Sequence, residues 1–173
     1  AITSIPTGYQ LAITTDTLVE GTHFLPSISP ADLAYKSVAV NLSDLAAMGA
    51  TPAWVSLALT LPEIKEAWLA EFSQSLFAIL ERYGVRLIGG DTTKGSLSIT
   101  LTAQGFLPEN QGLFRHQAKV GDWIFVSGFL GDSAAGLDLL LKNRKIENES
   151  DRYLIQRHLN PTPRVELGLA LRS

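Results

Sequence analysis

The chain has 173 residues, of which 46% are apolar and 18% are charged, so it can bury a sizeable core and does not have a disordered composition. Its formal net charge of -3 gives no basic excess for a nucleic-acid backbone, which argues against DNA or RNA binding. The absence of cysteine excludes disulfides, zinc–thiolate sites and cysteine nucleophiles. Neither a membrane-spanning apolar run nor a signal-peptide pattern is visible, so we expect a cytoplasmic protein.

The first part of the sequence predicts alternating strands and helices. Residues 9–15 alternate apolar and polar side chains as a strand does, and Asp16 follows where we expect this strand to end. Ser29 followed by Pro30 is typical of a helix start, and this helix would stop near Gly49. The next elements expected are a strand over 53–61, a helix over about 63–83, a short strand over 85–88 and a strand over 97–106.

A loop rich in glycine, asparagine and glutamine follows at about 108–121. Beyond it we expect a strand at 123–127, helices at about 132–142 and 153–158, and a last helix that starts near Pro161 and Pro163. The order β-α-β-α-β-β, then β-α-α, predicts an α+β fold. The loop is the expected boundary between a first domain at 1–110 and the start of a second α+β domain at 111–173.

Three aspartates are the main candidates for metal binding. Asp16 and Asp91 are expected at strand ends, where a rigid scaffold presents functional side chains, although aspartate also closes ordinary turns. Asp44 lies in the apolar stretch AVNLSDLAAMG (39–49), which predicts a carboxylate on an apolar helix face. A carboxylate in such a place needs a partner, either arginine or lysine or a metal ion.

Hydroxyl groups flank two of these carboxylates. Thr14 and Thr15 precede Asp16, and two further threonines follow Asp91 in GGDTT (89–93). Carboxylate, hydroxyl and carbonyl oxygens are the ligands that magnesium takes, with substrate phosphates and water completing its shell. The pattern therefore favours magnesium bound together with a phosphorylated ligand.

Other motifs are weaker. Gly89 and Gly90 allow the backbone to approach a ligand closely, but a plain turn is the alternative, and the order of Lys94 and Gly95 excludes a Walker A loop. The segment GFLG (128–131) before a helix could hold an anion, although Asp132 and Ser133 are more simply capping residues. Neither His23 nor Arg115 belongs to a motif that assigns it a function, and a structural or surface role is the usual alternative for each.

Four segments together resemble thiamine-monophosphate kinases, a family within the superfamily of ATP-dependent enzymes that includes aminoimidazole ribonucleotide synthetase. They are TTDTLVEGTHF (14–24), DLAYKSVAVNLSDLAAMGATPAW (32–54), LIGGDTTKG (87–95) and GDWIFVSGFLGDSAAGL (121–137). The resemblance implies an N-terminal domain of the aminoimidazole ribonucleotide synthetase-like type, transfer of a phosphoryl group from ATP to thiamine monophosphate, several magnesium ions and a homodimer.

The resemblance also implies roles for individual residues. Metal ligands would be Thr14, Thr15, Asp16, Asp44 and Asp91, where the family usually has serine at the first of these positions. His23 would contact thiamine monophosphate, and Gly90, Asp91 and Arg115 would contact ATP. The family carries further acidic motifs before the position of Ala1 and after that of Ser173, so we expect little activity from these 173 residues alone.

Phosphoryl transfer requires positioning and charge neutralisation more than covalent chemistry, so no protein nucleophile is expected. Two alternatives remain. One is another ATP-dependent enzyme of the same superfamily, such as an aminoimidazole ribonucleotide, selenophosphate or hydrogenase-maturation type. The other is a non-catalytic nucleotide- or metal-binding dimerisation module.

Overall fold

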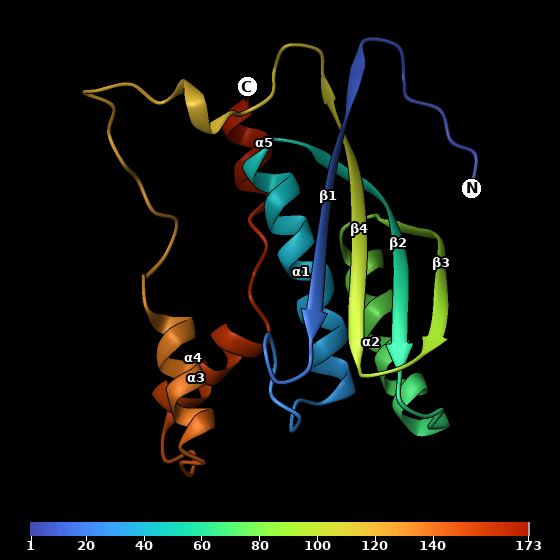
Figure 1. Cartoon of the computed structure of the whole chain (residues 1–173). Helices are drawn as coiled ribbons and strands as arrows, with labels where there is room; N and C mark the ends of the chain where they lie inside the picture. Colours follow the sequence, from blue (N-terminus) through green and yellow to red (C-terminus); the bar gives the residue numbers. More distant parts are fainter. Residues whose placement is uncertain (173) are drawn as a thin grey trace.

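One mixed sheet organises the computed structural model, which describes residues 1–172. Helices α1 and α2 cover one face of this sheet, and α5 lies beside α1, whereas α3 and α4 form a pair at the side (Figure 1). The strands are β1 (Tyr9–Val19), β2 (Thr51–Leu61), β3 (Arg86–Lys94) and β4 (Ser98–Pro108). The helices are α1 (Pro30–Ala47), α2 (Glu66–Arg82), α3 (Asp132–Leu141), α4 (Glu149–Leu159) and α5 (Val165–Arg172), with a 3-10 turn at Arg115–Gln117.

The strand order β1-β4-β2-β3 makes β1 and β3 the two edges of the sheet. Strand β4 is antiparallel to both β1 and β2, whereas β2 and β3 run parallel through the α2 crossover. Register pairs align one row across all four strands, through Thr17, Thr100, Ala58 and Asp91. Asp91 therefore lies at the opposite edge of the sheet from β1.

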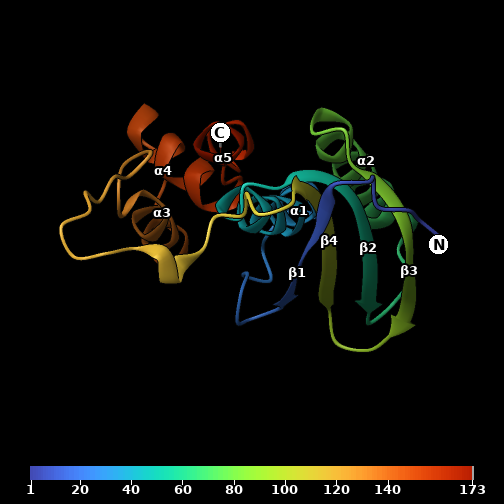
Figure 2. The ribbon, with the colours of Figure 1, turned by 90° about the horizontal axis from the view of Figure 1, so that it is seen from above.

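The two faces of the sheet differ in burial. On β4, buried Ile99, Leu101 and Ala103 alternate with half-buried Thr100 and Thr102. Figure 2 shows from above that α1 and α2 lie on one side of the sheet, and the buried set belongs to the core on that side. The threonines mark the other face, which we call the open face. This alternation is that of a sheet with one covered side. The prediction of an α+β fold is confirmed.

Helix α1 carries the largest part of the core. Ser29 caps it by accepting a hydrogen bond from the Asp32 amide at 3.0 Å, and Pro30 follows, as the sequence predicts. Leu33, Val38 and Leu42 are no more than 1% exposed. The helix ends before Gly49, as expected.

The second half of the chain folds back onto the first. At Gly168 the α5 backbone lies so close to α1 that an added Cβ would sit 2.1 Å from the Ala46 carbonyl oxygen. Asn160, which follows α4, donates a hydrogen bond to Asp32 of α1 at 2.6 Å. The predicted capping roles of Asp132 and Ser133 are wrong, because Gly131 occupies the N-cap without a side-chain bond. Both side chains instead contact α4.

Three expectations about strands need correction. Strand β1 continues past residue 15 to Val19, and β3 continues past residue 88 to Lys94, so Asp16 and Asp91 lie within strands and not at their ends. The strand expected at 123–127 does not form, and its apolar side chains, such as Trp123 and Phe125, are exposed. A strand needs a neighbour to satisfy its backbone groups, and residues 1–172 supply none there. None of the helices described over residues 1–172 combines the length and the hydropathy of a membrane span.

Candidate functional site

Three of the predicted metal ligands lie where strand β1 passes along helix α1. Two hollows border this contact, one lined by Thr14 and Asp44 and the other by Asp16, and we call the stretch that they border the groove. Thr14 and Asp16 pair with buried residues of β4, so both side chains point to the face of the sheet that α1 covers. The Thr14 hydroxyl donates a hydrogen bond to the Asp44 carboxylate across 2.7 Å. The structure thus brings Thr14, Asp16 and Asp44 together from two elements.

The apolar helix face predicted for Asp44 is wrong. Its neighbours Leu42, Leu45 and Ala46 are buried, but Asp44 itself is exposed. The helix turns about 100° per residue, so a carboxylate can sit in an apolar stretch and still point away from the core. Asp44 therefore has no need of a partner to offset burial, and its case as a metal ligand depends on its place in the groove.

Asp16 and Asp44 affect each other electrostatically. Partial burial raises the pKa of the Asp16 carboxyl, the negative charge of Asp44 raises it further, and His23 opposes both effects. Neither carboxylate forms an ion pair with arginine or lysine within residues 1–172. A divalent ion bound beside Asp16 and Asp44 would offset the repulsion between their charges.

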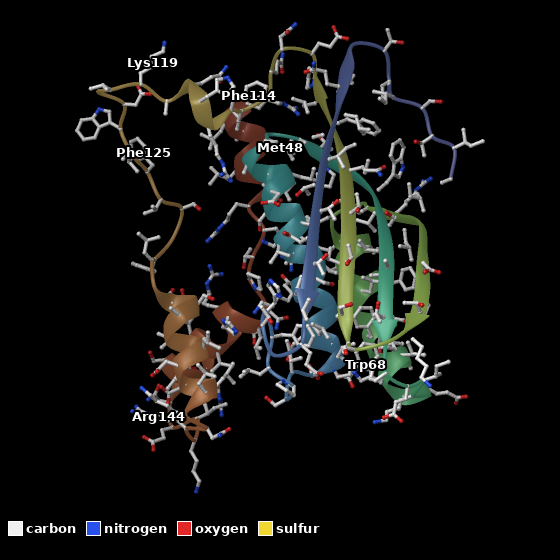
Figure 3. All side chains as sticks on the ribbon, viewed as in Figure 1. Met48, Trp68, Phe114, Lys119, Phe125 and Arg144 are labelled. Atoms are coloured by element: carbon white, nitrogen blue, oxygen red, sulfur yellow. The ribbon has the colours of Figure 1, made fainter. Side chains whose placement is uncertain are left out.

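A hollow of about 470 Å³ lies at one end of the groove. Figure 3 labels Met48 and Phe114 near each other at that end of α1. The walls combine apolar side chains with the hydroxyl of Thr14, the carboxylate of Asp44 and the guanidinium of Arg115, a mixture typical of small-molecule sites. The lining residues are Ile13, Thr14, Asp44, Ala47, Met48, Leu113, Phe114 and Arg115.

His23 lies at the other end of the groove, in the turn after β1. Its Nδ1 accepts a hydrogen bond from the Val19 amide at 3.1 Å. The neutral ring must then carry its proton on Nε2, which makes that nitrogen a donor. His23 lines a smaller hollow of about 190 Å³ together with Asp16 and Lys36.

Asp91 lies apart from this groove. It is on the open face at the β3 edge, in the row that ends at Thr17 of β1. Three strand spacings separate the ends of that row by about 14 Å. In agreement with this separation, residues 1–172 hold no group of three or more acidic or histidine side chains placed so that they could bind one metal ion. One copy of the chain thus does not unite Asp16, Asp44 and Asp91.

Gly90 has a structural reason for being glycine. Its φ is +155°, and a Cβ there would lie 1.9 Å from the Leu57 carbonyl oxygen of β2. The close backbone approach expected at this glycine is therefore made to a neighbouring strand. Gly89 differs, since an added Cβ would have nothing within 4 Å.

Sequence reasoning missed Lys36 and the apolar wall formed by Met48, Leu113 and Phe114. Lys36, Val40 and Asp44 are spaced by four residues, so they lie along one side of α1. That spacing was the signal that could have found Lys36. The wall could not be found in this way, because it joins the end of α1 to a loop more than 60 residues later in the sequence.

The chain is similar to thiamine-monophosphate kinases along nearly its whole length. It is 65% identical over 171 residues to that enzyme of Haemophilus influenzae, which covers 99% of this chain and 52% of the relative. A crystal structure of thiamine-monophosphate kinase from Stenotrophomonas maltophilia matches with a TM-score of 0.91 at 46% identity, over 96% of this chain and 54% of that one. A structure of AaThiL complexed with AMPPCP and TMP matches with a TM-score of 0.91 at 35% identity, over 98% and 55%.

The chain spans about half the length of these relatives. The predicted resemblance to thiamine-monophosphate kinases is nevertheless confirmed, since both sequence and fold match. The model of the family described as AIR synthase related protein, N-terminal domain, matches residues 1–107, which are the sheet, α1 and α2. The chain therefore belongs to the AIR synthase related protein family and carries its N-terminal domain.

Proposed function

We propose that the full-length protein containing this chain phosphorylates thiamine monophosphate with ATP in the cytoplasm and forms thiamine diphosphate. The observation that carries the proposal is the pair of hollows along the groove, because Asp44 lines the hollow that holds Arg115 and Asp16 lines the hollow that holds His23. Two anionic substrates need a site with a place for each and a charged region between them. The names of the relatives and the AMPPCP and TMP of the AaThiL complex support this assignment.

In the proposed reaction, a phosphate oxygen of thiamine monophosphate attacks the γ-phosphorus of ATP. A new P–O bond forms while the bond to the β,γ-bridging oxygen breaks, and ADP leaves with that electron pair. Arg115, Gly90 and Asp91 bind ATP, and His23 binds the acceptor. No protein side chain becomes phosphorylated, so trapping a phosphoenzyme during turnover would contradict this route.

Magnesium fits the residues of the groove in its chemistry. Thr14, Asp16 and Asp44 of the groove would hold it, together with Thr15 and Asp91 of the open face, since hydroxyl and carboxylate oxygens are its usual protein ligands. When bound, it supplies positive charge that offsets the substrate phosphates. The repulsion between Asp16 and Asp44, neither of which forms an ion pair with lysine or arginine within residues 1–172, supports this assignment.

A homodimer would account for the isolation of Asp91. Thr15 lies on the open face at the β1 edge, and Asp91 lies on the same face at the β3 edge. The open face of β1 also exposes Tyr9, Ile13 and Val19, an apolar set that a second copy would cover. If two sheets meet by these faces with unlike edges adjacent, Asp91 of a second copy comes beside Thr15 and Thr17, on the edge strand whose other side carries Asp16.

We also propose that residues 1–110 form the metal- and ATP-binding and dimerisation domain, and that 111–173 begin the second domain. The matched family model ends at residue 107, close to this boundary.

The function is tested with full-length protein, ATP and magnesium. Formation of thiamine diphosphate from thiamine monophosphate supports the proposal. Phosphorylation of another superfamily substrate in an acceptor panel would assign a different enzyme of the superfamily. Metal-dependent ATP binding without any transfer would instead indicate a binding module.

Complementation tests the shared site. Full-length Asp44→Asn and Asp91→Asn variants should each be inactive. Co-expression should restore about a quarter of wild-type activity, because about half of the dimers contain one copy of each variant and each such dimer has one intact site out of two. Co-expression without any recovery would show that Asp91 acts in its own subunit.

A further inference from the structure

Lys36 is a half-buried lysine without an acidic partner. It lies on the side of α1 that carries Asp44. Within residues 1–172, the lysines that form ion pairs are Lys65 with Glu63 and Lys142 with Asp138, and both pairs are exposed. Burial lowers the pKa of the Lys36 ammonium group, because the charged form loses water. A partly desolvated cation of this kind is stabilised by any anion that reaches it.

The hollow beside Lys36 has the size of a subsite. Its volume of about 190 Å³ is below the roughly 300–1,000 Å³ of sites that enclose a whole drug-sized ligand, so it suits one chemical group of a larger molecule. Its lining residues are Asp16, Thr17, Leu18, His23, Lys36 and Val40.

Two donors border this hollow. His23 offers Nε2–H, since its Nδ1 is occupied by the Val19 amide. Lys36 offers its ammonium hydrogens, and lysine can only donate. An oxyanion such as a phosphate group accepts hydrogen bonds from both kinds of donor. Asp16 would repel that group directly, which fits a cation placed between them in the proposed reaction.

His158 of α4 contacts Lys36 and does not line this hollow. Lys36 Nζ lies 3.3 Å from His158 Nε2, and Ser133 Oγ lies 3.2 Å from His158 Nδ1. Because the ammonium must donate, Nε2 accepts, and the ring proton lies on Nδ1 and points to Ser133. Burial and the charge of Lys36 lower the pKa of His158, which favours the neutral ring that this arrangement needs. The partner of Lys36 is therefore an uncharged ring, which does not neutralise an ammonium charge as a carboxylate would.

We propose that Lys36 binds the phosphate group of the phosphorylated acceptor next to His23, and that His158 positions Lys36. This inference rests on the proposed kinase function and assigns the acceptor end of the groove. It also gives α3 and α4 a part in the site, although both lie outside the matched N-terminal domain.

The test compares phosphorylated and unphosphorylated acceptors on full-length protein. Lys36→Met keeps the length of the side chain and removes its charge. It should weaken binding of thiamine monophosphate by about 10- to 100-fold, the effect of losing a charge-assisted hydrogen bond. Binding of thiamine, which lacks the phosphate, and the KM for ATP should not change. Lys36→Arg should retain most of the affinity for thiamine monophosphate.

Lys142→Met is the matched control, since it removes an exposed, already paired lysine and should leave both affinities unchanged. Equal weakening of thiamine and thiamine monophosphate by Lys36→Met, or no weakening of either, would overturn the proposal. Thermal melting identifies a variant that fails to fold, in which case Lys36→Gln replaces it in the same comparison.

His158 has its own readout. His158→Gln keeps an acceptor for Lys36 and should preserve the KM for thiamine monophosphate, whereas His158→Leu should raise that KM with little change in kcat. An unchanged KM for thiamine monophosphate in His158→Leu would show that His158 does not position Lys36. If wild-type protein makes no thiamine diphosphate, the kinase function fails, yet the affinity difference between thiamine monophosphate and thiamine still decides the role of Lys36.

Discussion

Thr14 and Asp44, 30 residues apart in the sequence, are joined by a hydrogen bond of 2.7 Å between β1 and α1. The bond directs the Asp44 carboxylate along the groove without burying it, because the residue remains exposed. Function at this position can therefore be separated from stability, since the charge contributes to the groove and not to the core.

Asp44→Asn should lower kcat/KM of the full-length protein by about 100-fold or more, if Asp44 binds magnesium in the reaction. Asparagine keeps an oxygen for Thr14, so the free energy of unfolding should change by no more than about 0.5 kcal/mol. Magnesium titrations of the rate, together with thermal melts, measure both effects. Asp138→Asn on α3 is the control and should be silent in the rate. Full activity of Asp44→Asn would show that it is not a ligand.

Gly90→Ala should destabilise the protein strongly, whereas Gly89→Ala should have little effect. At Gly90 a Cβ would lie 1.9 Å from the Leu57 carbonyl oxygen, and the φ of +155° disfavours any side chain. Separating β3 from β2 or straining the backbone costs about 2 kcal/mol or more. Urea unfolding of the two variants measures the contrast. Similar midpoints would mean that β3 is not held against β2 as described.

The local elements of this fold were predictable because their signals are local. Ser29 and Pro30 begin α1 through chemistry contained in two residues, and alternation along β4 marks its covered face. Strand ends were less predictable. Asp16 and Asp91 resemble loop residues in sequence, but β4 and β2 supply backbone partners that continue the strands past them.

The candidate site was predictable as a set of residue types and not as an arrangement. Thr14, Asp16 and Asp44 meet because β1 passes over α1, whereas Asp91 is separated from them by the strand order. That order depends on long-range pairing, which a short motif does not encode. Asp44 is exposed because its position on the helix points away from the core, although its neighbours in the sequence are apolar.

Arg115→Gln should raise the KM for ATP by about 10-fold or more and leave the KM for thiamine monophosphate nearly unchanged. Arg115 lines the larger hollow, at the end of the groove away from His23, and glutamine keeps a polar side chain while losing the charge that pairs with phosphate. Steady-state kinetics with each substrate varied in turn measures the split. A rise confined to thiamine monophosphate would reverse the assignment of the two ends of the groove.

Asp16→Asn should lower the activity of the protein and raise its stability, and the gain in stability should depend on pH. The folded-state pKa of Asp16 is raised above the ordinary 3.8, chiefly by burial and then by Asp44, so the folded protein binds this proton more tightly than the unfolded chain does. Stability from this carboxyl is therefore fully present below about pH 3.8 and is lost as the pH rises through the folded-state pKa. Removing the charge should raise the melting temperature at pH 7 and leave it nearly unchanged near pH 3.

Thermal melts of the full-length protein between pH 3 and pH 8, in buffer with a chelator, measure this difference between variant and wild type. Asp138→Asn serves as the control, since its carboxylate is exposed and paired with Lys142. Added magnesium should then stabilise wild type more than Asp16→Asn, because the ion would offset the same repulsion that the substitution removes. A variant that is less stable than wild type at pH 7, with the deficit absent near pH 3, would show that the Asp16 charge is stabilised in the folded protein and would contradict the electrostatic account of the groove.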